Sequence, residues 1–513
     1  MSCSVVVCIA PRPLNTMKAA VHSELDLTAL DAFVSEHPFA KATYILTQLR
    51  VCYERRLTKI AGKMRIAERV LAELASGSEE VKRRAIGDTV LRCAVQHSLR
   101  QLETGEKYGL PLEQCEAIFS ATVDYLRSGK IGLLTSHFPN CVGSSSYHPR
   151  LWSINGSGNE FARAFETLIR NNYGGELHSP SSEEVSMLSK GVRLLEILLP
   201  QSARGALHHV QVVALFQPGG PWKTTASSSQ FKLSGTIFMS RRFISDPWWV
   251  AEHILHEALH QQMYDFRHGH TLLRDDCDRA DAPKVRSLWN LPNGNLWDSH
   301  RTLAAFHVYV YLTLFGLIAE QRVKELEDEF GRAPAGFITG SMKSMQRATY
   351  LGSQIKSTIW DEFGPAGKKY VEFFANVLEI ISNNPPPPGC RLHLLLDRYA
   401  REGRILQSLL TSEMRRPDLA MVLDMLAERE IRTAKAALEL ARPGSDRSRL
   451  DGALHAIATG DRGAQFGTIR QVLLGGISEV LRDGYVLSDD SKADDIVGAM
   501  IESSSEDIRQ LLN

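Results

Sequence analysis

The sequence lacks an excess of charge of either sign. Its 513 residues carry 59 Lys and Arg against 59 Asp and Glu, so the formal net charge at pH 7 is zero. Without a surplus of positive charge, there is no general electrostatic attraction to nucleic acid or to an acidic membrane surface. We therefore expect neither a nucleic acid nor a membrane as a partner.

The chain also lacks cysteine pairs of the C-x-x-C type. Its eight cysteines are scattered from Cys3 to Cys390, which favours reduced thiols over a disulfide framework or a thiolate zinc site. The N-terminal run SVVVCIA is too short to span a bilayer, has no basic residue before it and is followed at once by PRP. These features predict a soluble, cytoplasmic protein.

Helical periodicity dominates the chain, so the predicted fold class is mainly α, of the α+β type. Apolar residues at three- and four-residue spacing predict a helical N-terminal region over residues 1–130. A central domain over residues 131–382 is expected to hold a small β-sheet, formed by the segments HHVQVVALF and QFKLSGTIFMS, followed by long helices. The prolines of NNPPPPG predict a linker over residues 383–390, because they cannot continue a helix. Residues 391–513 predict a helical C-terminal domain that carries no recognisable motif.

The clearest chemical signal is the string HEALH at residues 256–260. The preceding Ser-Asp-Pro, residues 245–247, supplies a helix N-cap and a proline at the first helical position, so we expect a helix to begin there. Four residues apart on that helix, His256 and His260 point the same way and can hold one ion. Glu257 can then reach a metal-bound water or a substrate without being a ligand.

A metal site of this kind needs a third protein ligand. The metzincin continuation fails, because Phe266 stands where the third histidine should be. His268 and His270 are close in sequence, but they follow the expected end of the helix. The preferred third ligand is therefore His307, in the apolar segment AAFHVYVYL, although a lone histidine there is also typical of a buried core position. Glu320 is the alternative that a zinc peptidase would use.

Several segments between residues 201 and 381 follow one another in a characteristic order. They are SSSQFKLSGTIFMS, SDPWWVAEHILHEALHQQMYD, the tryptophan-bearing stretch SLWN…NLWDSHRTL with AAFHVYVYL, QRATYLGSQI, and WDEFGPAGKKYVEFF. This order resembles the α-ketoglutarate-dependent HExxH-type peptide β-hydroxylases, which are found with ribosomally made peptide natural products. Members of that family often carry Arg-Pro a few residues before the later histidine, whereas this chain reads Ser-His-Arg-Thr at residues 299–302.

The resemblance implies oxidation of a peptide, not its cleavage. It implies that His256, His260 and His307 hold Fe(II) and leave positions open for 2-oxoglutarate and O₂. The expected product is a peptide side chain hydroxylated at Cβ, in the maturation of a ribosomal peptide natural product. Glu257 would then be the catalytic residue that handles a proton.

The distal carboxylate of 2-oxoglutarate needs a cation, ideally a bidentate arginine. Arg301 and Arg347 are the candidates, and each also fits a structural role. Trp289 and Trp297 are expected either to line a peptide groove or to pack in the core.

Two alternatives remain open on the residues alone. In a zinc peptidase, His256, His260 and either His307 or Glu320 would hold zinc, and Glu257 would be the general base on a zinc-bound water. In a non-catalytic helical scaffold, the histidines would be structural. The partner expected of either enzyme is a peptide, and the flanking regions are large enough to bind a leader peptide or a partner protein.

Overall fold

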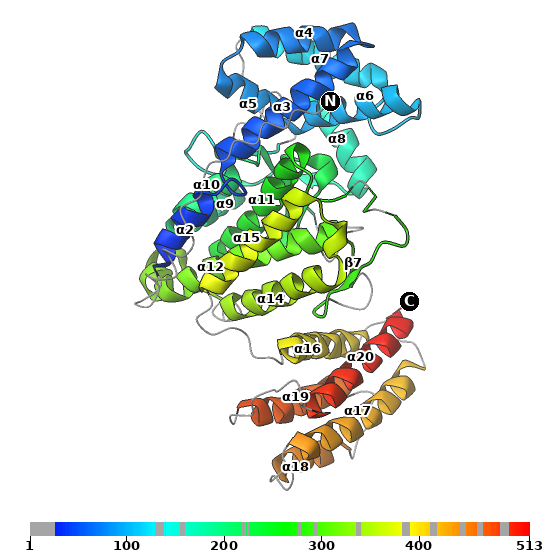
Figure 1. Ribbon diagram of the computed structural model, residues 1–513. Helices are drawn as coiled ribbons and strands as arrows, with labels where there is room; N and C mark the ends of the chain where they lie inside the picture. Colours follow the sequence, from blue (N-terminus) through cyan, green and yellow to red (C-terminus); the bar gives the residue numbers. More distant parts are fainter. Residues whose placement is uncertain are drawn as a thin grey trace. The chain divides into compact units, whose positions relative to one another are not determined.

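The computed structural model describes residues 26–128, 138, 140–153, 160–217, 219, 222, 225–274, 276–277, 279–290, 295–334, 340–381, 390–410, 418–441, 448–458, 465–482 and 492–512. Most of these residues are helical, and the strands are few and short, which confirms the predicted mainly α fold with a small sheet (Figure 1). The chain divides into two compact units. Unit 1 comprises residues 1–272, 307–344 and 364–381, and unit 2 comprises residues 273–306, 345–363 and 382–513.

The described part of unit 1 begins with consecutive helices, as the sequence predicts. They are α2 (Leu27–Glu36), α3 (Ala42–Ala61), α4 (Arg65–Ser76), α5 (Glu79–Gly87), α6 (Thr89–Thr104) and α7 (Leu112–Arg127). Asp26, Ser78 and Asp88 each accept hydrogen bonds from backbone N–H groups in the first turn of the next helix, which sets three of these starts. The apolar faces of α3 to α7 share one core with strand residues such as Val212 and Phe238.

A small mixed sheet follows, with helices between its strands. Its strands are β1 (Arg150–Leu151), β2 (Leu177–His178), β3 (Val212–Phe216), β4 (Ser227–Ser229) and β5 (Thr236–Ser240), and the helices are α8 (Glu160–Tyr173), α9 (Ser182–Leu198) and α10 (Pro200–Leu207). The strand order is β1-β3-β5-β4, with β2 also paired to β3. β3 is parallel to β1 and β5, and β4 is antiparallel to β5. The fully buried strands β3 and β5 confirm the two predicted strand segments.

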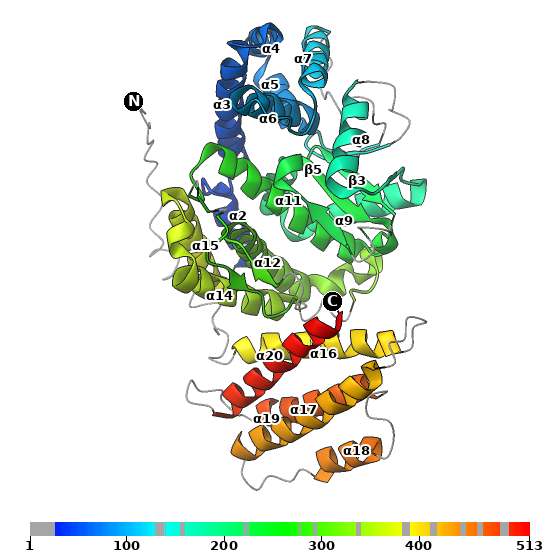
Figure 2. The ribbon, with the colours of Figure 1, turned by 90° about the vertical axis from the view of Figure 1, so that its right-hand side faces the viewer.

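Helix α11 (Pro247–Gly269) carries the HEALH string and begins where the sequence predicts. The Asp246 side chain accepts a hydrogen bond from the Trp248 N–H at 2.9 Å, and proline occupies the first helical position. The helix packs against β4 and β5 and against α3, α9 and α10 (Figure 2). It continues through Gly269, so the expectation that His268 follows the helix end was wrong.

Three longer helices come after α11, namely α12 (Ser299–Phe330), α14 (Gly340–Thr358) and α15 (Pro365–Ile381). Their positions confirm the predicted run of long helices. α12 is long and apolar enough to cross a membrane, but 83% of its most apolar 18-residue segment is buried inside the protein, which is typical of a core helix. In unit 2, the short strands β6 (Val285–Arg286) and β7 (Leu296–Trp297) pair in antiparallel fashion.

The C-terminal part of unit 2 is a bundle of helices, which confirms the predicted helical character of this region. They are α16 (Cys390–Leu410), α17 (Leu419–Ala441), α18 (Ser448–Ala458), α19 (Phe466–Arg482) and α20 (Lys492–Leu512).

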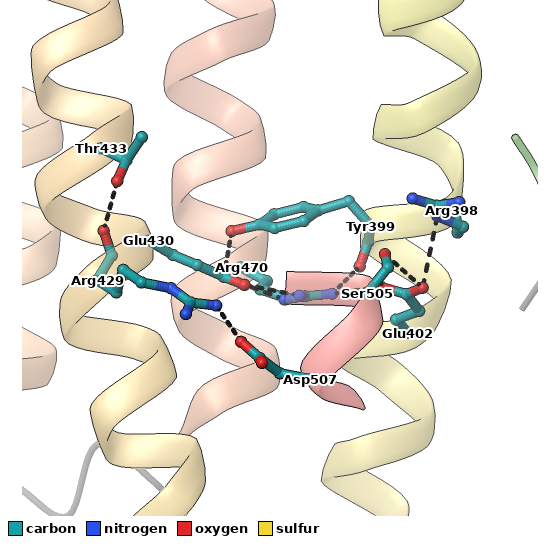
Figure 3. Close-up of polar contacts among 9 residues, drawn as sticks. All are labelled: Arg398, Tyr399, Glu402, Arg429, Glu430, Thr433, Arg470, Ser505 and Asp507. Atoms are coloured by element: carbon teal, nitrogen blue, oxygen red, sulfur yellow. Dashed lines mark hydrogen bonds and ion pairs between the residues drawn. The ribbon is translucent and has the colours of Figure 1, made fainter. Parts of the chain in front are cut away.

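A network of buried charged side chains lies inside this bundle (Figure 3). Arg470 donates hydrogen bonds to both carboxylate oxygens of Glu430, at 2.7 and 3.1 Å, and to Glu402 at 3.2 Å, and all three side chains are fully buried. The Tyr399 hydroxyl donates to Glu430 at 2.7 Å, and the Ser505 hydroxyl donates to Glu402 at 2.9 Å. The network joins α16, α17, α19 and α20, so the packing of four helices depends on matched buried charges.

The two units do not coincide with the domains expected from the sequence. Because α3 packs along α11, the N-terminal helices belong to the same unit as the HEALH string. Residues 273–306 and 345–363 belong with the C-terminal bundle, to which Arg347 is joined by an ion pair with Asp397 at 3.3 Å. Of the predicted linker, residues 383–389 lie outside the described residues.

Candidate metal centre

Polar side chains of α11 fix the helix against its surroundings. Gln261 donates a hydrogen bond to the Thr236 carbonyl at 3.0 Å and accepts one from the Gly235 N–H at 2.7 Å, at the start of β5. Gln262 donates to the Ala40 carbonyl at 2.8 Å, between α2 and α3. These bonds set the rotation of α11, and therefore the direction in which the HEALH side chains project.

A buried ion pair anchors the second half of α11. Asp265 pairs with Arg92 of α6 at 2.8 Å through one carboxylate oxygen and with His209 at 2.7 Å through the other, and all three side chains are at most 2% exposed. A carboxylate this deeply buried needs such partners, because burial without them is costly. The contact holds α11 to the N-terminal helices and to the residues that precede β3.

His256 and His260 come together as their helical spacing predicts. Their Nε2 atoms lie 3.2 Å apart, their rings meet edge to face, and both side chains are half-buried. Two nitrogens bound to one ion at about 2.1 Å each, at about 90–109° to one another, would be separated by about 3.0–3.4 Å. The observed separation fits two ligands of a single cation, and it is also the length of a hydrogen bond between the two imidazoles.

Glu257 lies on the neighbouring side of α11, facing β4. Its side chain is buried, and Oε1 accepts a hydrogen bond from the Ser227 hydroxyl at 2.7 Å. Oε2 is also buried and has no hydrogen-bond partner among the described residues. Burial raises the pKa of Glu257 to about 7, although serine hydroxyls on β4 act in the opposite direction. A carboxyl group with a pKa near neutrality can both accept and return a proton.

Sequence reasoning missed several neighbours of the histidine pair. The His260 ring stacks on Tyr264, and the His253 ring stacks on Trp249 at a centroid distance of 4.0 Å. Both contacts join residues four apart on α11, so helical spacing could have found them. Ser227 could not be found in this way, because a run of serines is typical of a loop.

His307 is fully buried in α12 and packs against aromatic rings. The ring centroids of Tyr311, Tyr370 and Phe374 lie 5.1, 5.4 and 4.8 Å from its own. Neither ring nitrogen has a hydrogen-bond partner among the described residues, and burial lowers the pKa of His307 to about 3. Two unpartnered nitrogens would suit a missing ligand, yet the structure does not bring this imidazole to the His256–His260 pair.

The other ligand candidates have structural roles. Both carboxylate oxygens of Glu320 accept hydrogen bonds from Ser341, from its N–H at 3.1 Å and its hydroxyl at 2.7 Å, so this carboxylate caps the start of α14. His268 contacts Arg56 at 3.3 Å and stacks on the Phe231 ring. These contacts do not support the zinc-peptidase ligand set that includes Glu320.

The arginines predicted to bind 2-oxoglutarate belong to unit 2 and pack on tryptophans. The Arg301 guanidinium lies 4.8 Å from the ring centre of Trp297, and that of Arg347 lies 5.1 Å from the ring centre of Trp289. The two indole rings meet edge to face and are 2% and 4% exposed, so the tryptophans are packing residues. Arg347 also pairs with Asp397. The role of both arginines in binding a co-substrate stays a prediction.

Across the ranges that the structure describes, no three His, Cys, Asp or Glu side chains form a group that could hold a metal ion. The predicted set of three ligands is therefore not assembled. His256 and His260 fit two positions around a cation, and water or substrate would have to fill the others.

Comparison with known proteins adds no further assignment, because no protein-family model and no curated protein matches the chain. The class that the described residues define is a mainly α protein in which an HExxH helix packs against the edge of a small mixed sheet. No activity of the chain follows from these comparisons.

Proposed function

We propose that the chain is a metal-dependent enzyme that hydroxylates a peptide side chain at Cβ, using Fe(II) and 2-oxoglutarate, with its centre on α11. The observation that carries the metal part is the 3.2 Å separation between the Nε2 atoms of His256 and His260. The reaction class is supported by the order of the segments over residues 201–381, which resembles the HExxH-type peptide β-hydroxylases. The proposed setting is peptide natural-product maturation in the cytoplasm.

We assign the following roles in metal binding and proton transfer to residues of this chain. His256 and His260 bind the cation, and iron with 2-oxoglutarate and O₂ supplies the oxidising chemistry. Glu257 holds a proton on Oε2, the oxygen not engaged by Ser227. The hydrogen bonds of Gln261 to the start of β5 fix α11, and with it the two histidines, against the sheet. We assign no third protein ligand, and a ligand role for His307 is the expectation from the sequence that replacement of this residue tests.

A second candidate function is zinc-dependent peptide hydrolysis. It is favoured by the position of Glu257, whose carboxyl lies one residue from His256 and is held by Ser227 of the edge strand β4. A carboxylate beside a metal-bound water is the general base that such hydrolysis needs. The two functions therefore share the histidine pair and differ in the metal, in the co-substrate and in the product.

Anaerobic reconstitution followed by exposure to O₂ separates these functions. We expect succinate to form from 2-oxoglutarate only when Fe(II) is present, and a candidate peptide to gain the mass of one oxygen. His256→Ala should abolish turnover. His253→Gln is the matched control, because it changes an imidazole one turn earlier on α11 that contacts the Trp249 carbonyl at 3.0 Å.

Other outcomes contradict the proposal in distinct ways. Peptide cleavage that depends on zinc, without succinate, would support the peptidase. No metal-dependent activity, together with unchanged behaviour of His256→Ala, would support a non-catalytic scaffold.

A further inference from the structure

A polar pocket of about 340 Å³ lies beside β1, at one edge of the sheet in unit 1. It is lined by the end of α5, the loop over residues 141–148, the first residue of β1 and the residues just before β3. The Glu257–Ser227 contact involves β4, at the other edge of the same sheet. The pocket is therefore separate from the proposed metal centre.

Positive charge dominates the wall of this pocket. Arg83, Arg84 and Arg150 line it, and none of its lining residues is Asp or Glu. Arg83 and Arg84 share the single carboxylate of Glu80, at 2.7 and 2.6 Å. Arg150 is exposed and makes no side-chain hydrogen bond or ion pair with the described residues. Three guanidinium groups against one carboxylate leave a surplus of two positive charges.

One carboxylate and one guanidinium lie next to lining residues but outside the lining itself. Glu196 lies outside the lining, and its Oε1 contacts His148 Nε2 at 2.9 Å and also accepts a hydrogen bond from the Tyr147 hydroxyl. The Arg204 guanidinium carbon lies 5.9 Å from the Tyr147 ring centre. Burial lowers the pKa of His208, another lining residue, so its imidazole adds no charge at neutral pH.

Hydrogen bonds hold the loop over residues 141–148, which lines the pocket, in place. The Ser145 N–H donates to His148 Nδ1 at 3.1 Å, and Arg84 donates to the Ser146 carbonyl at 3.4 Å. Gly143 lies directly against the His148 ring, where a Cβ atom would come within 2.0 Å of Nδ1. The hydroxyls of Ser144 and Ser146 make no hydrogen bond to described residues and are available as donors.

We propose that this pocket binds a small molecule that carries a phosphate group. Guanidinium groups and serine hydroxyls are the donors that oxyanions prefer, because arginine offers two parallel N–H groups to two oxygens. The surplus of two charges matches a phosphate monoester, which carries about −1.5 to −2 at pH 7, better than a single carboxylate. The parallel rings of Tyr147 and His208, 5.0 Å apart, add a flat wall beside the anion.

Titration of the full-length protein with inorganic phosphate, at constant ionic strength, tests this proposal. We expect one saturable site per chain by calorimetry. Arg150→Gln should weaken phosphate binding by about tenfold or more, because it removes a charge-assisted hydrogen-bonding group. Arg69→Gln is the matched control, since this arginine is exposed on α4 and lies outside the pocket lining. Acetate should bind more weakly than phosphate.

Each other outcome overturns the proposal. Absence of saturable phosphate binding would do so, and so would equal affinities in the Arg150→Gln and Arg69→Gln variants, which would indicate a general salt effect. Acetate binding as tight as phosphate binding would refute the assigned ligand class. Arg84→Gln, checked for an unchanged helical circular dichroism spectrum, provides a second variant. Because the pocket does not include α11, metal binding by His256 and His260 should be the same in all of these variants.

Discussion

Replacement of His307 by leucine separates a packing role from a ligand role. The imidazole is fully buried among aromatic rings, and neither ring nitrogen has a hydrogen-bond partner among the described residues. A buried polar group without a partner costs about 1–3 kcal/mol. An apolar side chain of similar size should therefore leave the free energy of unfolding unchanged or raise it by about 1 kcal/mol. Because His307 does not form a ligand group with His256 and His260 in the described part of the structure, we expect His307→Leu to bind the same amount of metal.

The assay combines urea unfolding, followed by circular dichroism, with metal analysis of the purified protein. Phe374→Leu is the control, because it removes part of a ring that contacts His307 without touching a possible ligand. That variant should lose about 1 kcal/mol or more of stability and keep its metal. If His307→Leu loses its metal while Phe374→Leu keeps it, the reasoning from the structure is refuted and the third ligand expected from the sequence is restored.

Two further predictions concern charge and burial. Burial lowers the pKa of His97 to about 4. Between pH 6.5, the ordinary pKa of histidine, and pH 4, the imidazole binds a proton in the unfolded chain but not in the folded one. The free energy of unfolding should therefore fall as the pH drops from about 6.5 to 4, and His97→Asn should remove up to about 3 kcal/mol of that fall. Equal pH slopes of the two proteins in urea unfolding would contradict this. Arg470→Met leaves the buried carboxylates of Glu402 and Glu430 without their shared cation and should cost about 3–5 kcal/mol. Arg429→Met breaks a half-exposed pair and should cost under about 1 kcal/mol, and similar losses in the two variants would show that the network does not stabilise the bundle.

The sequence predicted the parts of the site that depend on local rules. Asp246 and Pro247 mark the start of α11 because capping involves only neighbouring residues. His256 and His260 meet because a helix places residues four apart on one side. The strands β3 and β5 could be identified because their short apolar segments are themselves a local signal of buried strands.

The parts that depend on distant segments were not predicted. The serine strand β4, whose Ser227 holds Glu257, forms because β5 pairs with it, and its own residues do not favour a strand. The surroundings of His307 are set by α15, some 60 residues later, through Tyr370 and Phe374. No helical or strand period along the chain could have shown that these aromatic rings enclose the imidazole.

The pocket beside β1 was equally invisible in the sequence. Arg83 and Arg150 are separated along the described chain by α6 and α7, and the parallel pairing of β1 with β3 brings Arg150 beside the residues that precede β3. In the sequence, the run of glycine and serines over residues 143–146 indicates no more than a loop.

The central claim is that His256 and His260 share one divalent cation. Anaerobic calorimetric titration of the metal-free protein with Fe(II) tests it most directly. The account predicts one ion per chain, and an affinity that falls by more than about 100-fold in His256→Ala and in His260→Ala, because loss of residues that merely support ligands already costs 10–100-fold. His253→Gln should bind as the unaltered protein does. The claim is contradicted if all four proteins bind Fe(II) equally, or if the unaltered protein binds none.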